Sequence, residues 1–219
     1  VLAAFRALAA ELGVWLLIGS ISIKVAEDKM ANRQFLIDDG GNIVARYSKI
    51  HMFDVQVGDG QTYRESNTYR AGEEAVVVET PWCKLGLSIC YDIRFPYLYR
   101  DLAKAGAEVI VTPAAFTKVT GEAHWHVLQR ARAIENGVFI VTAAQTGEHA
   151  EGRQTYGHSL VVDPWGRVLS DAGEDVGVTL AEIDLSEVEK ARAKVPSLTH
   201  DRSYDGPNLI SQEFRKAGE

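Results

Sequence analysis

The sequence predicts a layered α/β fold in which helices alternate with buried strands and tight hairpins. Apolar residues recur at helical spacing over 2–12, whereas apolar and small residues alternate over 85–89 as in a buried strand. Turn signals rich in Asp, Gly and Pro separate such segments along the whole chain. With 219 residues, 46% of them hydrophobic, the chain can bury one large core, so we expect a single domain over 1–219.

In the first half, one helix precedes a series of hairpins. Gly13 is placed to end the helix, and Asp and Gly residues at 38–41 supply the backbone angles of a tight turn. The longest polar loop is expected to form an active-site wall. The expected elements are a helix at 2–12, a strand at 14–23 broken at Gly19 and Ser20, a hairpin of 34–37 with 43–49, the loop at 54–74, and a hairpin of 76–79 with 84–89.

The second half continues the alternation of helices and strands. Pro96 is well placed to open a helix, and Ser186 with Glu189 resembles a capping box. The expected elements are a helix at 96–105, a strand at 109–113, a helix at 123–136, a strand at 138–144, a polar loop at 145–157, a hairpin of 158–162 with 167–170, a strand at 176–183 and a helix at 186–193.

Composition excludes several classes of protein. The formal net charge of -7 argues against nucleic acid or an anionic membrane as the main partner. No apolar run approaches the roughly 18–20 residues that span a bilayer. Cys83 and Cys90 do not suggest a disulfide framework, so we expect a cytoplasmic protein. The motifs of serine hydrolases, P-loop NTPases and Rossmann dehydrogenases are missing from the sequence.

Cys90 is the first candidate for chemistry. It follows the strand at 84–89 and precedes the helix opened by Pro96, so its side chain is expected at the edge of a sheet. The alternative is a small buried core residue, which is the commoner role of a lone cysteine. A catalytic thiolate would need a neighbouring base or cation and a donor for the developing oxyanion.

Lys49 and Glu65 are candidates to assist it. Lys49 ends a strand, where lysine more often serves to protect a sheet edge. Glu65 lies in the long polar loop, where a solvated carboxylate is the usual interpretation. The histidines are weaker candidates: His124 and His126 point apart on a helix, and His158 starts a strand alone, so no metal site is expected.

Several motifs, in order, resemble those of the nitrilase superfamily, the carbon–nitrogen hydrolases. They are YSKIHMFD at 47–54, GLSICYDIRFP at 86–96 and RARAIEN at 130–136. The segments YGHS at 156–159 and VVDPWG at 161–166 resemble the Nit branch of that family. The resemblance extends from residue 9 to about 203 and implies a four-layer α-β-β-α sandwich that pairs with a second subunit across a dimer interface.

The resemblance also implies roles for individual residues. Cys90 would attack an amide or nitrile carbon, and Lys49 would stabilise the tetrahedral intermediate together with the backbone N–H of Tyr91. Glu65 matches an additional loop glutamate of the family and would orient Lys49 or assist proton transfer. Arg94 would help to bind a substrate carboxylate, unless it forms a structural ion pair, and Phe116 would line the pocket, unless it only packs in the core.

One element of the family pattern is missing. The family's general-base glutamate lies on a strand upstream of the helix that resembles 2–12, and neither Glu11 nor Glu27 lies in a matching motif. We therefore expect that the N-terminal strands of the domain are absent from this sequence. The alternative is a binding or scaffold protein that kept the fold and lost its base, which would typically cost about 100- to 10,000-fold in rate.

The leading functional hypothesis is an amidase that needs no metal or cofactor. It would hydrolyse a small linear, carboxylate-bearing amide through a thioester on Cys90, with deaminated glutathione as the type of substrate that the motifs resemble most. An ω-amidase acting on α-ketoglutaramate is the nearest alternative, and an acyltransferase or true nitrilase would share the same thioester. The expected partners are the small substrate and further copies of the chain, in a homodimer or higher homo-oligomer.

Overall fold

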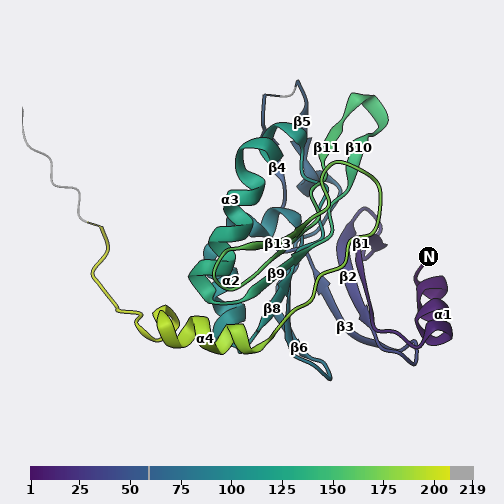
Figure 1. Ribbon diagram of the computed structural model, residues 1–219. Coiled ribbons are helices and arrows are strands. Elements are labelled where there is room, and N and C mark those ends of the chain that lie inside the picture. Colours follow the sequence, from purple (N-terminus) through teal and green to yellow (C-terminus); the bar gives the residue numbers. More distant parts are fainter. Residues whose placement is uncertain (59, 208–219) are drawn as a thin grey trace, which may run out of the picture.

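The computed structural model describes residues 1–58 and 60–207, which form two facing β-sheets with helices on their outer faces (Figure 1). The smaller sheet has the order β1-β2-β3 and is antiparallel. The larger sheet has the order β13-β12-β9-β8-β7-β6, with parallel pairs at its centre. The order of layers is therefore α-β-β-α, as the resemblance implied.

The smaller sheet and its helix come from the N-terminal part of the chain. Gly13 ends α1 in the left-handed conformation, and a bulge between Ile18 and Ser20 interrupts the pairing of β1, so both sequence predictions are confirmed. The elements are α1 (Leu2–Leu12), β1 (Leu16–Lys24), β2 (Met30–Ile37) and β3 (Ile43–Ser48).

The larger sheet carries two helices on its outer face. Pro96 is the first residue of α2, as predicted. Helix α3 begins five residues before the predicted start because the Thr117 side chain accepts a hydrogen bond from the Thr120 N–H and caps it there. The elements are β6 (Val76–Glu79), β7 (Lys84–Leu87), α2 (Pro96–Lys104), β8 (Val109–Val111), α3 (Lys118–Asn136), β9 (Phe139–Thr142), β12 (Leu160–Val162) and β13 (Val168–Asp171).

Hydrophobic clusters between the layers hold them together. Alternate side chains of each central strand face opposite layers: Ile110 packs toward α2 and α3, whereas Val111 packs toward the smaller sheet. Between the sheets, Tyr47 of β3 lies against Leu87 of β7. On the far side, Ala9 of α1 packs on the smaller sheet. Each layer thus buries its apolar side chains against the next.

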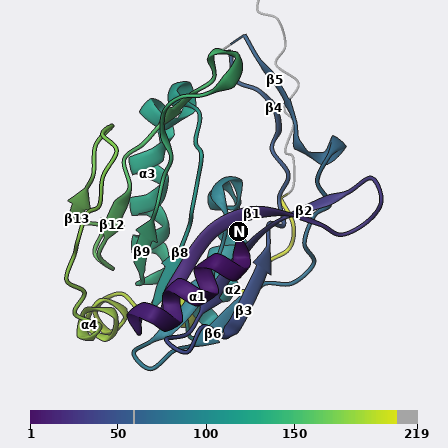
Figure 2. The same cartoon turned by 90° about the vertical axis from the view of Figure 1, so that its right-hand side faces the viewer.

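Two short hairpins rise from the same end of the sandwich (Figure 2). They lie in the segments predicted as polar loops, which therefore contain strands as well. The Gln61 side chain donates to the Glu151 carbonyl oxygen at 3.3 Å and links the two hairpins. Their strands are β4 (Asp54–Gln56) with β5 (Thr62–Arg64), and β10 (Thr146–Glu148) with β11 (Gln154–Tyr156).

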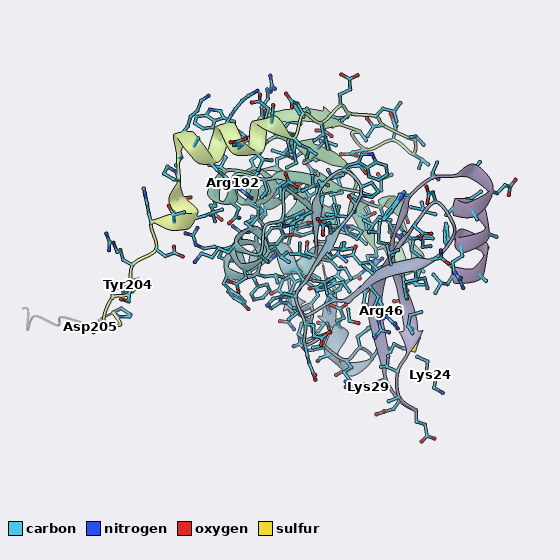
Figure 3. The ribbon with its side chains drawn as sticks, turned by 90° about the horizontal axis from the view of Figure 1, so that it is seen from below. Lys24, Lys29, Arg46, Arg192, Tyr204 and Asp205 are labelled. Atoms are coloured by element: carbon cyan, nitrogen blue, oxygen red, sulfur yellow. The ribbon has the colours of Figure 1, made fainter. Side chains whose placement is uncertain are left out.

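Helix α4 (Ser186–Lys194) packs against the larger sheet through a fourth hydrophobic cluster, in which its Val188 joins Val109 of β8 and Phe139 of β9. Arg192 points from α4 toward the body of the protein and donates to the Ala107 carbonyl oxygen at 2.7 Å (Figure 3). The predicted capping box is wrong, because the carboxylate of Asp184 accepts from the Ser186 N–H and O–H instead. Beyond α4 the chain runs away from the sheets through Tyr204 and Asp205 (Figure 3).

The strand predicted at 176–183 is wrong. Val176, Val178 and Leu180 alternate as in a strand but are 93%, 94% and 89% exposed. Within residues 1–58 and 60–207 no strand pairs with this segment, so its alternating residues form no ladder of hydrogen bonds with a neighbouring strand.

The helices of this described part include none long and apolar enough to cross a membrane.

The packing predicts that Trp125 is critical for stability. Trp125 is fully buried against Phe116, and its indole N–H donates to the His158 carbonyl oxygen at 2.8 Å. Trp125→Ala should lower the free energy of unfolding by about 3–5 kcal/mol in urea titrations. Trp82→Ala is the control, since Trp82 is 65% exposed. Equal losses in the two variants would contradict this account of the core.

Candidate active site

Cys90 occupies a strained turn at the end of the larger sheet. It is the third residue after β7 and opens a 3-10 turn, Cys90–Arg94, with a φ of 48°. This left-handed conformation is costly for a residue other than glycine and is common at functional sites. The Cys90 N–H donates to the Pro113 carbonyl oxygen at 3.0 Å, which fixes the turn against the segment after β8. The predicted strand-to-turn position is confirmed.

Asp92 anchors this turn to the smaller sheet. Its carboxylate is fully buried and accepts four hydrogen bonds. One oxygen accepts from the Tyr47 hydroxyl at 2.7 Å and from the Ile89 N–H at 2.9 Å. The other lies 3.1 Å from the His51 N–H and 2.7 Å from its Nδ1. Because Tyr47 and His51 flank Lys49, Asp92 fixes the lysine segment relative to the cysteine turn.

Lys49 and Glu65 form an ion pair in the same cleft as Cys90. The side chain of Lys49 is 3% exposed and that of Glu65 is 15% exposed. The Glu65 carboxylate also accepts from the Phe53 N–H at 2.7 Å and from the Asn32 amide at 3.4 Å. Glu65 is therefore a bonded partner of Lys49 and not the solvated loop carboxylate of the alternative interpretation.

The electrostatic setting of Cys90 is a balance of opposing effects. Burial raises the pKa of the Cys90 thiol, and the Lys49 ammonium together with the Ala115 N–H opposes that rise. Glu65 and Asp92, which are negatively charged, raise the pKa further. Lys49 is thus the cation that favours the thiolate, which is the nucleophilic form of the side chain.

The cleft has a volume of about 910 Å³, within the range of small-molecule sites. Tyr91 and Phe116 line it beside the triad candidates. Arg94 is placed differently: its guanidinium lies 5.3 Å from the Phe116 ring centroid and does not line the cleft. Its ion pair with Asp92, the structural alternative, is not formed, because Asp92 bonds to Tyr47, His51 and Ile89.

Sequence reasoning missed three residues of this site. The role of Asp92 in joining the two segments has no local signal, since Tyr47 and His51 lie more than 40 residues away from it in sequence. Asn32 reaches Glu65 from β2, a strand predicted only from residue 34 onward. Arg153 lines the cleft from the loop between β10 and β11.

The side chains of His126, His158 and Asp171 lie close together outside the cleft.

Comparison with known proteins identifies the class of protein. Residues 1–193 match the family described as carbon–nitrogen hydrolase. The chain is 48% identical over 191 residues to a Synechocystis protein named deaminated glutathione amidase, covering 85% of this chain and 70% of that protein. A Yersinia enterocolitica protein of the same name is 44% identical over 200 residues, covering 90% of this chain and 70% of its own length.

Solved structures agree with the sequence comparison. The crystal structure of the Caenorhabditis elegans NitFhit protein superposes with a TM-score of 0.86 at 45% identity, over 92% of this chain and 50% of that one. The chain therefore spans about half the length of that protein. These similarities define an α/β enzyme that hydrolyses carbon–nitrogen bonds. The chain belongs to the carbon–nitrogen hydrolase family, the nitrilase superfamily, and the predicted resemblance to its Nit branch is confirmed.

The charge of Lys49 is expected to control the reactivity of Cys90. In Lys49→Met the cation is lost, so the pKa of the thiol should rise further and its alkylation by iodoacetamide near pH 8 should become severalfold slower. Peptide mass spectrometry separates Cys90 from Cys83, the other free cysteine. Lys84→Met, an exposed lysine on β7, is the matched control. Unchanged alkylation in Lys49→Met would refute the electrostatic role.

Asp92 is expected to carry a large share of stability. In Asp92→Asn the amide has one acceptor oxygen in place of two, so buried donors lose their partners. The free energy of unfolding should fall by about 2–5 kcal/mol. Asp101→Asn, on the exposed face of α2, should change it little. A stability close to that of wild type in Asp92→Asn would show that the network is dispensable.

Proposed function

We propose that the protein is an amidase that cleaves the C–N bond of a small linear, carboxylate-bearing amide through a thioester on Cys90. One observation carries the proposal: Lys49, Glu65 and Cys90 line a single cleft although they come from three separate segments of the chain. A nucleophile with an activating cation and a positioned carboxylate is the arrangement that covalent catalysis requires.

In the proposed reaction the Cys90 thiolate attacks the amide carbon and forms a C–S bond. Lys49 and the backbone N–H of Tyr91 stabilise the oxyanion, a contribution that is typically about 3–4 kcal/mol per donor. The C–N bond then breaks, and the nitrogen leaves as ammonia or an amine after taking up a proton. Water attacks the thioester, the C–S bond breaks, and a carboxylic acid and the free cysteine are released.

Proton transfer needs an acceptor close to the nucleophile. Asp92 is unsuited, because both of its oxygens already accept two hydrogen bonds each. Glu65 Oε1 has a single bond, to Asn32 at 3.4 Å, and so keeps acceptor capacity. We assign to Glu65 the orientation of Lys49 and assistance in proton transfer.

Two features support a carboxylate-bearing substrate. Arg153 lines the cleft, and Arg94 lies over the ring of Phe116, which also lines it. Arginine suits carboxylates because its fork of N–H groups can bind both oxygens. The Synechocystis and Yersinia relatives are named for deaminated glutathione, so we propose a substrate of that kind, with α-ketoglutaramate as the nearest alternative.

The enzyme is further proposed to act as a homo-oligomer in a reducing compartment such as the cytoplasm. Val127 and Ile134 lie two turns apart on α3 and are 67% and 53% exposed. Val176, Val178 and Leu180, in a separate segment, are also exposed. Large apolar side chains exposed on the surface favour burial against another subunit. Cys83 and Cys90 are both free, which suits a reducing environment.

Ammonia release tests the function. Wild type should release ammonia from deaminated glutathione, and Cys90→Ala should lose about 1,000-fold or more of that activity, because the covalent route is removed. Cys83→Ala, which changes the other free cysteine, should keep the wild-type rate.

Three outcomes would change the proposal. Equal rates in wild type and Cys90→Ala would exclude the thioester mechanism. A preference for α-ketoglutaramate would assign the ω-amidase alternative. No release from either amide, with the protein folded, would favour the non-enzymatic scaffold alternative.

A further inference from the structure

A second cluster of functional side chains lies outside the cleft. His126 of α3, His158 before β12 and Asp171 at the end of β13 bring their nitrogen and oxygen atoms within 4.8 Å of one another. None of the three lines the cleft that contains Cys90. Their side chains are 33%, 19% and 32% exposed, so the cluster is open to solvent on one side.

The spacing of the donor atoms fits a metal ion. His126 Nε2 and His158 Nδ1 lie 3.0 Å and 3.1 Å from the same Asp171 oxygen. Ligands at the usual zinc distances of about 2.0–2.2 Å are separated by roughly 3.3 Å along a tetrahedral edge. Bound metal would therefore require shifts of a few tenths of an ångström at these two edges.

The backbone around His158 is held in a costly conformation that aims its ring at the cluster. Its φ is 55°, in the left-handed region that residues other than glycine seldom adopt. The His158 N–H donates to the Gly173 carbonyl oxygen at 2.7 Å, and its carbonyl oxygen accepts from the Trp125 indole at 2.8 Å. Asp171 is fixed in turn by the Gly173 N–H at 2.9 Å. Strain that the surroundings maintain in this way points to function.

We propose that His126, His158 and Asp171 bind a divalent transition-metal ion, with Zn²⁺ as the type case. Two imidazoles and one carboxylate suit zinc and its neighbours in the first transition row better than calcium or magnesium, which prefer oxygen ligands. The solvent-exposed side leaves room for water as a fourth ligand. The ion would tie α3 to the β12–β13 edge of the larger sheet, and its role would be structural because it lies away from the cleft.

Zinc binding can be measured by competition with a chromophoric chelator. All proteins carry Cys90→Ala, so that the thiol of the cleft does not contribute. We expect one Zn²⁺ per chain, with affinity reduced about tenfold or more in His126→Gln, in His158→Asn and in Asp171→Asn. Asparagine is chosen at residue 158 because it tolerates the left-handed backbone. His124→Gln is the control, since His124 lies on the same helix, exposed and outside the cluster.

The thermal midpoint provides a second readout. A fixed Zn²⁺ concentration that just saturates the parent should raise it in the parent and in His124→Gln, and should raise it less in the three ligand variants. The result that overturns the proposal is either no binding by the parent up to millimolar Zn²⁺ or equal affinity in ligand variants and control. In that case the cluster is only a carboxylate hydrogen-bonded to two histidines. Circular dichroism of each metal-free variant excludes loss of fold as the cause of weaker binding.

Discussion

The buried carboxylate of Asp92 is the interaction on which the site depends. It lies between the two sheets, where an unpaired charge would be very costly, and each of its oxygens accepts two hydrogen bonds. Its partners Tyr47 and His51 stand two residues before and after Lys49, and Asp92 itself stands two residues after Cys90. One side chain thus sets the distance between the cation and the nucleophile.

The sandwich explains why these residues can meet. Lys49 follows the last strand of the smaller sheet, Cys90 follows a central strand of the larger sheet, and Glu65 follows the β4–β5 hairpin that stands over the end of both (Figure 2). The buried cluster that contains Tyr47 and Leu87 joins the two sheets. A strained φ at Cys90 persists because hydrogen bonds to Pro113 and Asp92 hold both sides of the turn.

Sequence patterns predicted most of the fold because the relevant signals are local. Helical spacing with Gly13, the proline at residue 96 and the turn at 38–41 each determine structure within a few residues. The errors share one physical cause. The segment at 176–183 has strand-like alternation, but within the described residues no strand lies beside it. At the start of α4, the Asp184 carboxylate accepts the hydrogen bond from the Ser186 N–H in place of the predicted capping box. Pairing and competition between caps depend on neighbours that periodicity does not show.

The site was predictable only as far as its motifs extended. Cys90, Lys49 and Glu65 were found because each lies in a long motif resembling one family, and the structure brings all three to one cleft. Asp92 depends on a contact with Tyr47, 45 residues away in sequence. In the cluster of His126, His158 and Asp171, His126 and Asp171 are likewise 45 residues apart. Such contacts leave no local pattern, so judging each histidine by its chain neighbours could not reveal the grouping.

The thioester on Cys90 is the central claim, and acid-quenched mass spectrometry during turnover tests it most directly. The account predicts that, after incubation with an amide substrate, the peptide containing Cys90 gains the mass of the acyl group. Treatment with hydroxylamine should remove that mass, as expected for a thioester. An acyl group on any other residue, or turnover that continues with Cys90 free throughout, would contradict the account.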